Sequence, residues 1–206
     1  MVLQLTSSDI EHLARLVKSN FQEVSARYDY AKYSPKDYER FKQVFEMRTA
    51  NNSDIKNALV WKWGHAGKDN FPIKQQELID YIIKLWPRYL KNHSRLPTPL
   101  ATYTFWMEEL HRSLNSNSRR YITAAYLTHL LHNKVTPIID QHNYRALATL
   151  LQKIRPTLKF KKKPSNWQDI EILNYFMESL CQHLNYSKGD LDKYLMMYGR
   201  YYCDRS

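Results

Sequence analysis

Apolar side chains recur three and four residues apart in one segment after another, which is the spacing that gives an α-helix one buried face. Nothing alternates convincingly at a period of two, and the chain contains only four glycines. We therefore expect about nine helical segments and an all-α fold. The two clearest stripes are Ile10, Leu13, Val17, Phe21 and Val24, and then Tyr38, Phe41 and Phe45.

Polar residues, prolines and one glycine indicate where the expected helices begin and end. Ser8 and Glu11 form a capping-box pattern at the start of the first helix. Ser53 is expected to start a helix that ends at Gly64, and Pro87 is expected to kink or end another. The remaining helices are expected to begin at Ser34-Pro35, Pro99, Arg119, Asp140, Ser165 and Ser187.

The charge of the chain favours a nucleic-acid partner. Its 31 Lys and Arg outnumber 20 Asp and Glu, which gives a formal net charge of +11, and 14% of its residues are aromatic. Such charge also serves solubility, but basicity together with many Tyr and Trp is typical of a nucleic-acid-binding surface. The densest basic run is Lys159-Phe160-Lys161-Lys162-Lys163, whose lysines either contact phosphates or form a solvated loop.

Cysteine usage and missing motifs argue against several classes of protein. Cys181 and Cys203 are the only cysteines, so we expect no disulfide framework, no zinc site and a reducing, cytoplasmic compartment. His129, His132 and His142 lack a further ligand at recognised spacing, and we expect neither a metal nor a cofactor. No apolar stretch has the length of a membrane span or a signal peptide, and no P-loop or nucleophile-elbow motif is present.

The most informative segment is Thr136 to Leu147, TPIIDQHNYRAL. Its residues 137–139 are typical of a buried extended segment. Asp140 follows where an N-cap side chain accepts hydrogen bonds from the first helical amides, and an aspartate so placed is usually only a cap. The helix after it is expected to offer Tyr144, Leu147, Ala148 and Leu151 to a core, and to leave Gln141, His142 and Arg145 near the mouth of a site.

Residues 139–145, IDQHNYR, resemble the V-D-T-H-V-x-R segment of helix-hairpin-helix DNA glycosylases, in which the aspartate is the catalytic carboxylate. The resemblance covers roughly residues 100 to 152, with Arg119 to Leu131 in the place of the hairpin and the helix that follows it. Two features depart from the pattern. Residues 114–121, LNSNSRRY, contain no glycine, so a phosphate would be held by the side chains of Ser116, Asn117, Ser118, Arg119 and Arg120. Gln141 stands where the family has threonine.

The resemblance implies a two-lobed monomer that acts on duplex DNA. Residues 1–50 and 155–206 would form one lobe and residues 51–154 the other, with hairpin and aspartate at the edge of a cleft. A damaged or modified base would be flipped into a pocket lined by Trp61 or Trp63, Tyr121 and Gln141. The two tryptophans cannot share one helical face, so we expect one of them in the core. The expected DNA contacts are Ser118, Arg119, Arg120, His142, Arg145, Lys161, Lys162 and Lys163.

The same resemblance implies that an ionised Asp140 stabilises positive charge on the sugar and orients or deprotonates a water. Helix amides and Arg145 would favour its ionised form. Bifunctional members add a lysine nucleophile in the helix after the hairpin, but this chain has none there before Lys134, and an arginine cannot form a Schiff base. We expect a monofunctional glycosylase, nucleoid-associated if bacterial, that serves DNA repair or defence against phage.

Two alternatives remain open at this point. A DNA-binding module of the same fold that has lost catalysis would bind duplex DNA without releasing a base. An all-helical interaction domain would use its positive charge toward an acidic protein or RNA, with Asp140 as a plain N-cap. In that second case Asp140→Asn would have little effect, because asparagine caps a helix about as well as aspartate.

Overall fold

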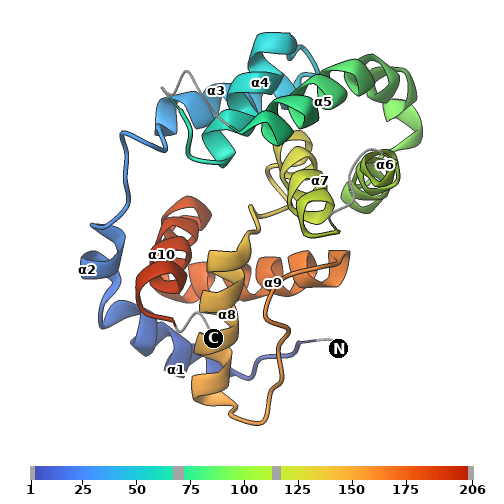
Figure 1. Cartoon of the computed structure of the whole chain (residues 1–206). Coiled ribbons are helices and arrows are strands. Elements are labelled where there is room, and N and C mark those ends of the chain that lie inside the picture. The colour runs from blue at the N-terminus through green and yellow to red at the C-terminus, as the bar shows by residue number, and fades with distance from the viewer. Residues whose placement is uncertain (1–2, 67–71, 113–116, 204–206) are drawn as a thin grey trace. The chain divides into compact units, whose positions relative to one another are not determined.

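The computed structural model describes residues 3–66, 72–112 and 117–203, and of residues 117–120 it describes the backbone alone. All regular elements in these ranges are helices, which confirms the predicted all-α fold (Figure 1). None of the described helices is both long and apolar enough to cross a membrane. The elements are α1 (Ser7–Lys18), α2 (Phe21–Ser25), α3 (Pro35–Glu46), α4 (Asn52–Lys62), α5 (Ile73–Asn92), the 3-10 helix η1 (His93–Arg95), α6 (Pro99–His111), α7 (Asn117–Leu131), α8 (Gln141–Ile154), α9 (Trp167–Leu184) and α10 (Lys188–Tyr201).

The chain divides into two compact units. Unit 1 combines two separate stretches, Met1–Tyr28 and Thr136–Ser206, whereas unit 2 is the continuous stretch Asp29–Val135. These boundaries differ from those expected at residues 50 and 154, because α3 belongs to unit 2 and α8 to unit 1. The Phe45 ring of α3 lies edge-on against Trp86 of α5, with 5.2 Å between ring centroids. Long-range packing of this kind determines which unit a helix joins.

Unit 1 is built around the contact between α8 and α10, which lie side by side (Figure 1). Each helix contributes a face of fully buried aliphatic and aromatic side chains. Helix α1 packs against α8 and α9 and covers a further part of the same core. The buried residues on the two central helices include Ala146, Leu147, Leu150 and Leu151 of α8 and Leu191, Tyr194, Leu195 and Tyr198 of α10.

Unit 2 has an aromatic core contributed by α5 and α6. The Trp106 indole is fully buried and stacks on both Trp86 and Tyr89, with ring centroids 6.4 and 5.4 Å apart. Pro87 lies inside this part of α5 and the helix continues to Asn92, so of the two expected alternatives, a kink or an end at Pro87, the end is contradicted. Burial of the rings on either side of the proline offsets the hydrogen bond that proline cannot donate.

The start and end of the first helix differ from the prediction. The capping box consists of Thr6 and Asp9 instead of Ser8 and Glu11, so α1 begins at Ser7. The predicted stripe is also interrupted, because the backbone leaves the helical conformation at Asn20 and a second helix begins at Phe21. The Asn20 side chain accepts a hydrogen bond from the Tyr194 hydroxyl of α10 at 3.0 Å. The break between α1 and α2 thus coincides with a contact to α10, which the spacing of apolar residues in this segment cannot indicate.

Most other predicted helix ends are confirmed. Ser34 and Ser187 cap α3 and α10, and Gly64 follows α4 with a positive φ of 66° that suits glycine. Helix α9 begins slightly later than expected, at Trp167, because Asn166 and not Ser165 is its N-cap. Helix α4 begins slightly earlier than expected, at Asn52, because Asn51 and not Ser53 is its N-cap. Local signals therefore place these helix starts to within a few residues.

Arg155 and Asp9 form an ion pair that links the end of α8 to α1 in unit 1. The hydrogen bond from Arg155, together with one from Thr6, lowers the pKa of Asp9 from 3.8 to about 2. Because the folded-state pKa lies below the unfolded one, this contribution to stability is present above about pH 4 and is lost as the pH falls toward 2. We expect Arg155→Gln to lower the urea midpoint at pH 7 and to approach the wild type as the pH falls to 2. A midpoint difference that persists unchanged at pH 2 would contradict this account.

Candidate functional site at the start of helix α8

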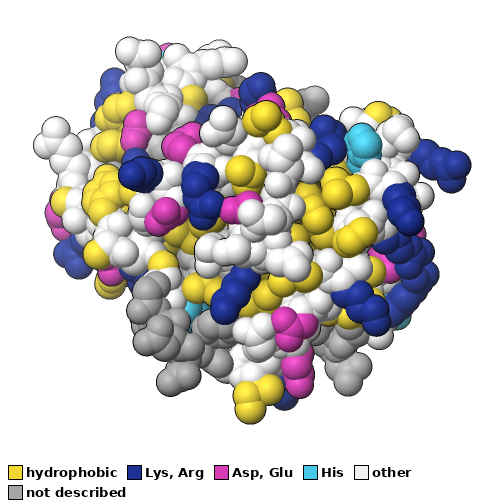
Figure 2. All heavy atoms as spheres, turned by 90° about the horizontal axis from the view of Figure 1, so that it is seen from above, with side chains coloured by type: hydrophobic (Ala, Val, Ile, Leu, Met, Phe, Trp, Pro, Cys, Tyr) yellow, Lys and Arg dark blue, Asp and Glu magenta, His cyan; other side chains and the backbone are white. Residues whose placement is uncertain are grey.

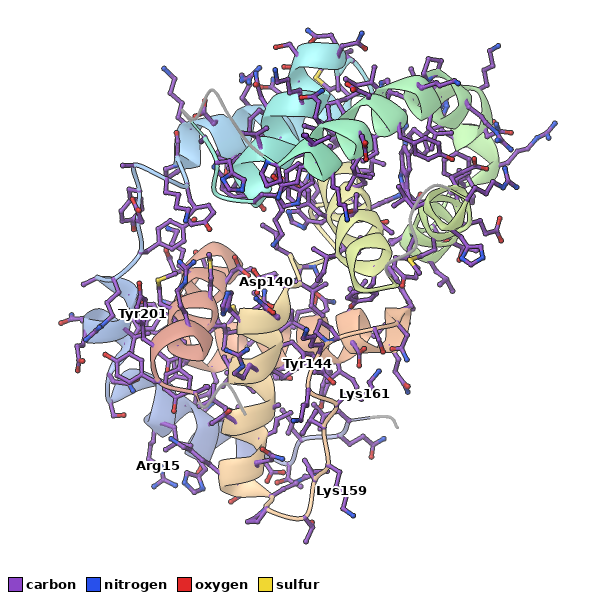
Figure 3. The ribbon with its side chains drawn as sticks, viewed as in Figure 1. Arg15, Asp140, Tyr144, Lys159, Lys161 and Tyr201 are labelled. Carbon is purple, nitrogen blue, oxygen red and sulfur yellow. The ribbon has the colours of Figure 1, made fainter. Side chains whose placement is uncertain are left out.

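Asp140 is the N-cap of α8, as predicted. Its Oδ1 accepts hydrogen bonds from the backbone amides of His142 and Asn143 at 2.7 and 3.1 Å. The Asn143 side chain in turn accepts from the Asp140 amide at 2.8 Å, which completes a capping box. Asp140 is half-buried at the N-terminal end of the helix, one turn from Tyr144 (Figure 3). These bonds hold the carboxylate in one orientation.

Asn143 connects three parts of the site, and the sequence analysis did not identify it. It is 1% exposed, and its Nδ2 donates to the Ile138 carbonyl at 2.7 Å and to Asp192 Oδ1 of α10 at 3.2 Å. Residues 136–139 before Asp140 are buried, as expected, and this amide fixes the segment to the helix. A capping residue three positions after Asp140 is the signal that would have indicated Asn143.

Helix α10 approaches the first turn of α8 very closely. A Cβ atom at Gly199 would lie 1.8 Å from the carbonyl oxygen of His142, so only glycine fits between these backbones. Arg145 Nη1 donates to the Gly199 carbonyl at 3.0 Å. Arg145, expected beside Asp140 as a DNA contact, thus also has a structural role in joining α8 to α10. His142 is half-buried and Gln141 is exposed.

The chemistry available to this arrangement is that of a fixed carboxylate. Hydrogen bonds from two backbone amides and the partial positive charge at a helix N-terminus both favour the ionised form of an aspartate. A carboxylate held in this way can stabilise a developing positive charge or accept a proton from water. A plain helix cap has the same hydrogen bonds, so catalysis by Asp140 stays a prediction.

The basic segment between α8 and α9, where Figure 3 labels Lys159 and Lys161, is only partly available to a ligand. Lys161 donates to Asp169 Oδ2 at 2.9 Å and to the Ser165 hydroxyl at 2.8 Å, so an internal partner already neutralises its charge. Lys162 and Lys163 are exposed, and no ion pair involves them within the described ranges. Of the three lysines expected to contact DNA, these two retain an unpaired charge.

Asp169 is a buried carboxylate that organises this segment. It is 3% exposed and accepts from the backbone amides of Ser165 and Asn166 at 2.6 and 3.1 Å, in addition to Lys161. The Tyr144 hydroxyl of α8 donates to its Oδ1 at 3.3 Å. Burial, then the nearby charge of Asp169, raises the pKa of Tyr144 far above its usual value. Tyr144 therefore remains protonated, and a hydrogen-bond donor, at neutral pH.

The aromatic residues expected around a flipped base belong to unit 2, and two of them are core residues. Trp61 is 6% exposed, stacks on Tyr38 at 5.0 Å between centroids and donates from Nε1 to the Ser34 carbonyl. Trp63 is half-buried at the C-cap of α4, so it is Trp61 that lies in the core. Tyr121 is 1% exposed. Neither Trp61 nor Tyr121 presents its ring on the surface, and of these three only Trp63 retains a partly accessible ring.

The predicted phosphate-binding hairpin lies largely outside the described residues. The side chains of Ser118, Arg119 and Arg120 are not described, although their backbone forms the first turn of α7. They belong to unit 2 with the tryptophans, whereas Asp140 belongs to unit 1. The grouping of these residues into one site therefore stays a prediction.

His129 of α7 and His132, which directly follows this helix, make separate internal contacts. His129 is 4% exposed, and its Nε2 lies 2.5 Å from the Tyr38 hydroxyl. The Nε2 of His132 lies 2.9 Å from Thr102 Oγ1, and burial, with the nearby charge of Arg48, lowers the pKa of His132. Over the described ranges, no three His, Cys, Asp or Glu side chains are grouped as a metal site requires.

The best-defined candidate site is thus the Asp140 carboxylate, which the fold of unit 1 holds rigidly. It is supported by Asn143 from its own helix and by α10 through Gly199. Comparisons of this chain with protein-family models, with curated proteins and with solved structures find no match.

Proposed function

We propose that this protein is a monofunctional DNA N-glycosylase that removes a damaged or modified base from duplex DNA, with Asp140 as its catalytic carboxylate. The observation that carries the proposal is the carboxylate itself, half-buried and fixed by the amides of His142 and Asn143 at a helix start. The IDQHNYR segment and the net charge of +11 point to the same function. No metal or cofactor is required for this chemistry.

In the proposed reaction a base leaves the stack before its glycosidic bond is cleaved, at a cost of a few kcal/mol that is smallest for damaged or weakly paired bases. The C1′–N bond breaks, its electron pair departs with the base, and positive charge develops on the sugar. Asp140 stabilises that charge and accepts a proton from the water that adds to C1′. Helix α7 contains no lysine, so the product is an intact strand with an abasic site.

The test is base release from duplexes that carry alkylated, deaminated, oxidised or phage-type modified bases, scored as abasic sites. We expect Asp140→Asn to release the same base at least about 100-fold more slowly than the wild type, the size of effect seen when a charge-stabilising group is lost. Its unfolding free energy should change by less than about 0.5 kcal/mol, because asparagine also caps helices well.

Two results would contradict the proposal. Full activity in a folded Asp140→Asn protein would remove Asp140 from the chemistry. Failure of the wild type to release any base of the panel, while it still binds duplex DNA, would favour the second candidate.

That second candidate is a DNA-binding module without catalysis. The observation in its favour is that Asp140 makes every bond of an ordinary capping box, with Asn143 as its reciprocal partner. It predicts salt-sensitive binding to duplex DNA with no abasic sites, and equal binding by the wild type and Asp140→Asn.

A further inference from the structure

Unit 2 contains more of the positive charge than unit 1. Between Asp29 and Val135 there are 17 Lys and Arg against 10 Asp and Glu, a net charge of +7 out of +11. The imbalance is greatest along the second half of α5 and the start of α6, because no acidic residue occurs between Asp80 and Glu108. Seen from above, Lys and Arg side chains gather on the right, the side on which the end of α5 and α6 lie in Figure 1 (Figure 2).

The cations of this region share one face of α5. Lys84, Arg88 and Lys91 follow one another at intervals of four and three residues, which places them in a row along one side of the helix. All three are exposed, as is Arg95 in η1 just beyond. In the described part of the chain no carboxylate pairs with Lys84, Lys91 or Arg95. Successive charges four residues apart are separated by about 6 Å along the helix axis.

The buried carboxylate of Glu109 binds both Arg88 of this row and Arg112, which directly follows α6. Glu109 of α6 is 4% exposed and accepts from Arg88 Nη1 at 3.0 Å and from Arg112 Nη1 at 3.2 Å. The two arginine side chains are 53% and 59% exposed. One carboxylate cannot neutralise two guanidinium groups, so one positive charge remains. Among the described residues each guanidinium bonds through Nη1 alone, so its other N–H groups can donate to a ligand.

We propose that Lys84, Arg88, Lys91, Arg95 and Arg112, here called the α5 basic face, bind the sugar-phosphate backbone of duplex DNA. Arginines held by a carboxylate offer preorganised N–H groups to phosphate oxygens. A surface that binds single strands also presents exposed aromatic rings on which bases stack, whereas every Phe, Tyr and Trp of α5 and α6 is buried or half-buried. The α5 basic face therefore contacts the backbone and not the bases, and positions the protein without regard to sequence.

This inference rests on the proposed function, because it requires the protein to bind duplex DNA. It adds a contact surface that is independent of the glycine-less segment 114–121 and of Asp140. The protein could therefore bind phosphates without the backbone amides that a glycine-containing hairpin would supply.

The experiment measures binding of an undamaged duplex as a function of salt concentration. Each lost phosphate contact reduces the slope of log K against log salt by about 0.9. We expect Lys84→Gln/Lys91→Gln to reduce the slope by about 2, and Arg88→Gln by about 1. The first variant leaves the Glu109 pairs intact, so its fold is not at risk. The matched control is Lys36→Gln/Lys56→Gln, which removes two exposed cations of unit 2 that belong to α3 and α4 and should keep the wild-type slope.

Three outcomes would overturn the inference in distinguishable ways. A wild-type protein without salt-dependent duplex binding would remove the proposed function and this surface together. Wild-type binding with an unchanged slope in Lys84→Gln/Lys91→Gln would remove the surface alone. An equal loss of slope in the control variant would show that net charge, and not this face, determines binding.

Discussion

Gly199→Ala is expected to destabilise the protein by about 3 kcal/mol or more, the upper end of the cost of overpacking a core. The new Cβ would lie 1.8 Å from the carbonyl oxygen of His142 and 2.6 Å from its carbonyl carbon. Both are backbone atoms, so no side-chain rotation relieves the clash and α8 and α10 must move apart. Alanine favours a helix by about 1 kcal/mol over glycine, and the clash must exceed that gain.

The movement should also reach the candidate site, because the amide of His142 donates to Asp140. We therefore expect lower base release in addition to a lower unfolding midpoint in urea. Gly189→Ala is the matched control on the same helix: its Cβ would meet only the Ser187 hydroxyl, at 3.8 Å. That variant should be as stable as the wild type or up to about 1 kcal/mol more stable. Equal midpoints for the two variants would refute the close approach of α8 and α10.

Asp169→Ala is expected to cost about 3 kcal/mol. It removes the N-terminal capping interaction of α9, which is worth about 1 kcal/mol, and leaves the buried Tyr144 hydroxyl without its acceptor, at about 1 to 3 kcal/mol. The amides of Ser165 and Asn166 also lose their partner. Chemical denaturation of the variant at pH 7, followed by circular dichroism, measures the loss.

Two further variants distinguish the contribution of the ion pair with Lys161 from that of the helix cap. Lys161→Gln should cost less than about 1 kcal/mol, because the Lys161 side chain is half exposed and such ion pairs contribute little. The loss of stability in Asp169→Asn should lie between those of Lys161→Gln and Asp169→Ala, since asparagine can accept from the same amides. If Lys161→Gln proved as harmful as Asp169→Ala, the ion pair and not the cap would hold the segment between α8 and α9.

Local signals in the sequence predicted the parts of the fold that depend on neighbouring residues. Ser34-Pro35, Ser187 and Asp140 each lie within three residues of the amides that they cap or precede, so short patterns were sufficient. The same holds for Gly64, whose left-handed conformation ends α4. The position of the candidate carboxylate at a helix start was predictable for this reason.

Features that depend on contacts between distant segments were not predictable. The choice of Trp61 over Trp63 for the core follows from Tyr38 and Ser34, which lie more than twenty residues earlier. The pairing of Lys161 with a buried Asp169 requires a turn whose geometry the basic run does not reveal. The close approach of α8 to Gly199 could not be predicted either, because Gly199 lies more than fifty residues after Asp140 and no local pattern marks it.

The division of the chain has a consequence for the order in which the protein forms during synthesis. Unit 2 is one continuous stretch, so it can fold as soon as Val135 has left the ribosome. Unit 1 must wait, because α1 emerges before unit 2 whereas its partners α8, α9 and α10 emerge after it. The apolar face of α1 is thus exposed throughout translation of unit 2, and Asp140 reaches its final setting only once Gly199 is translated.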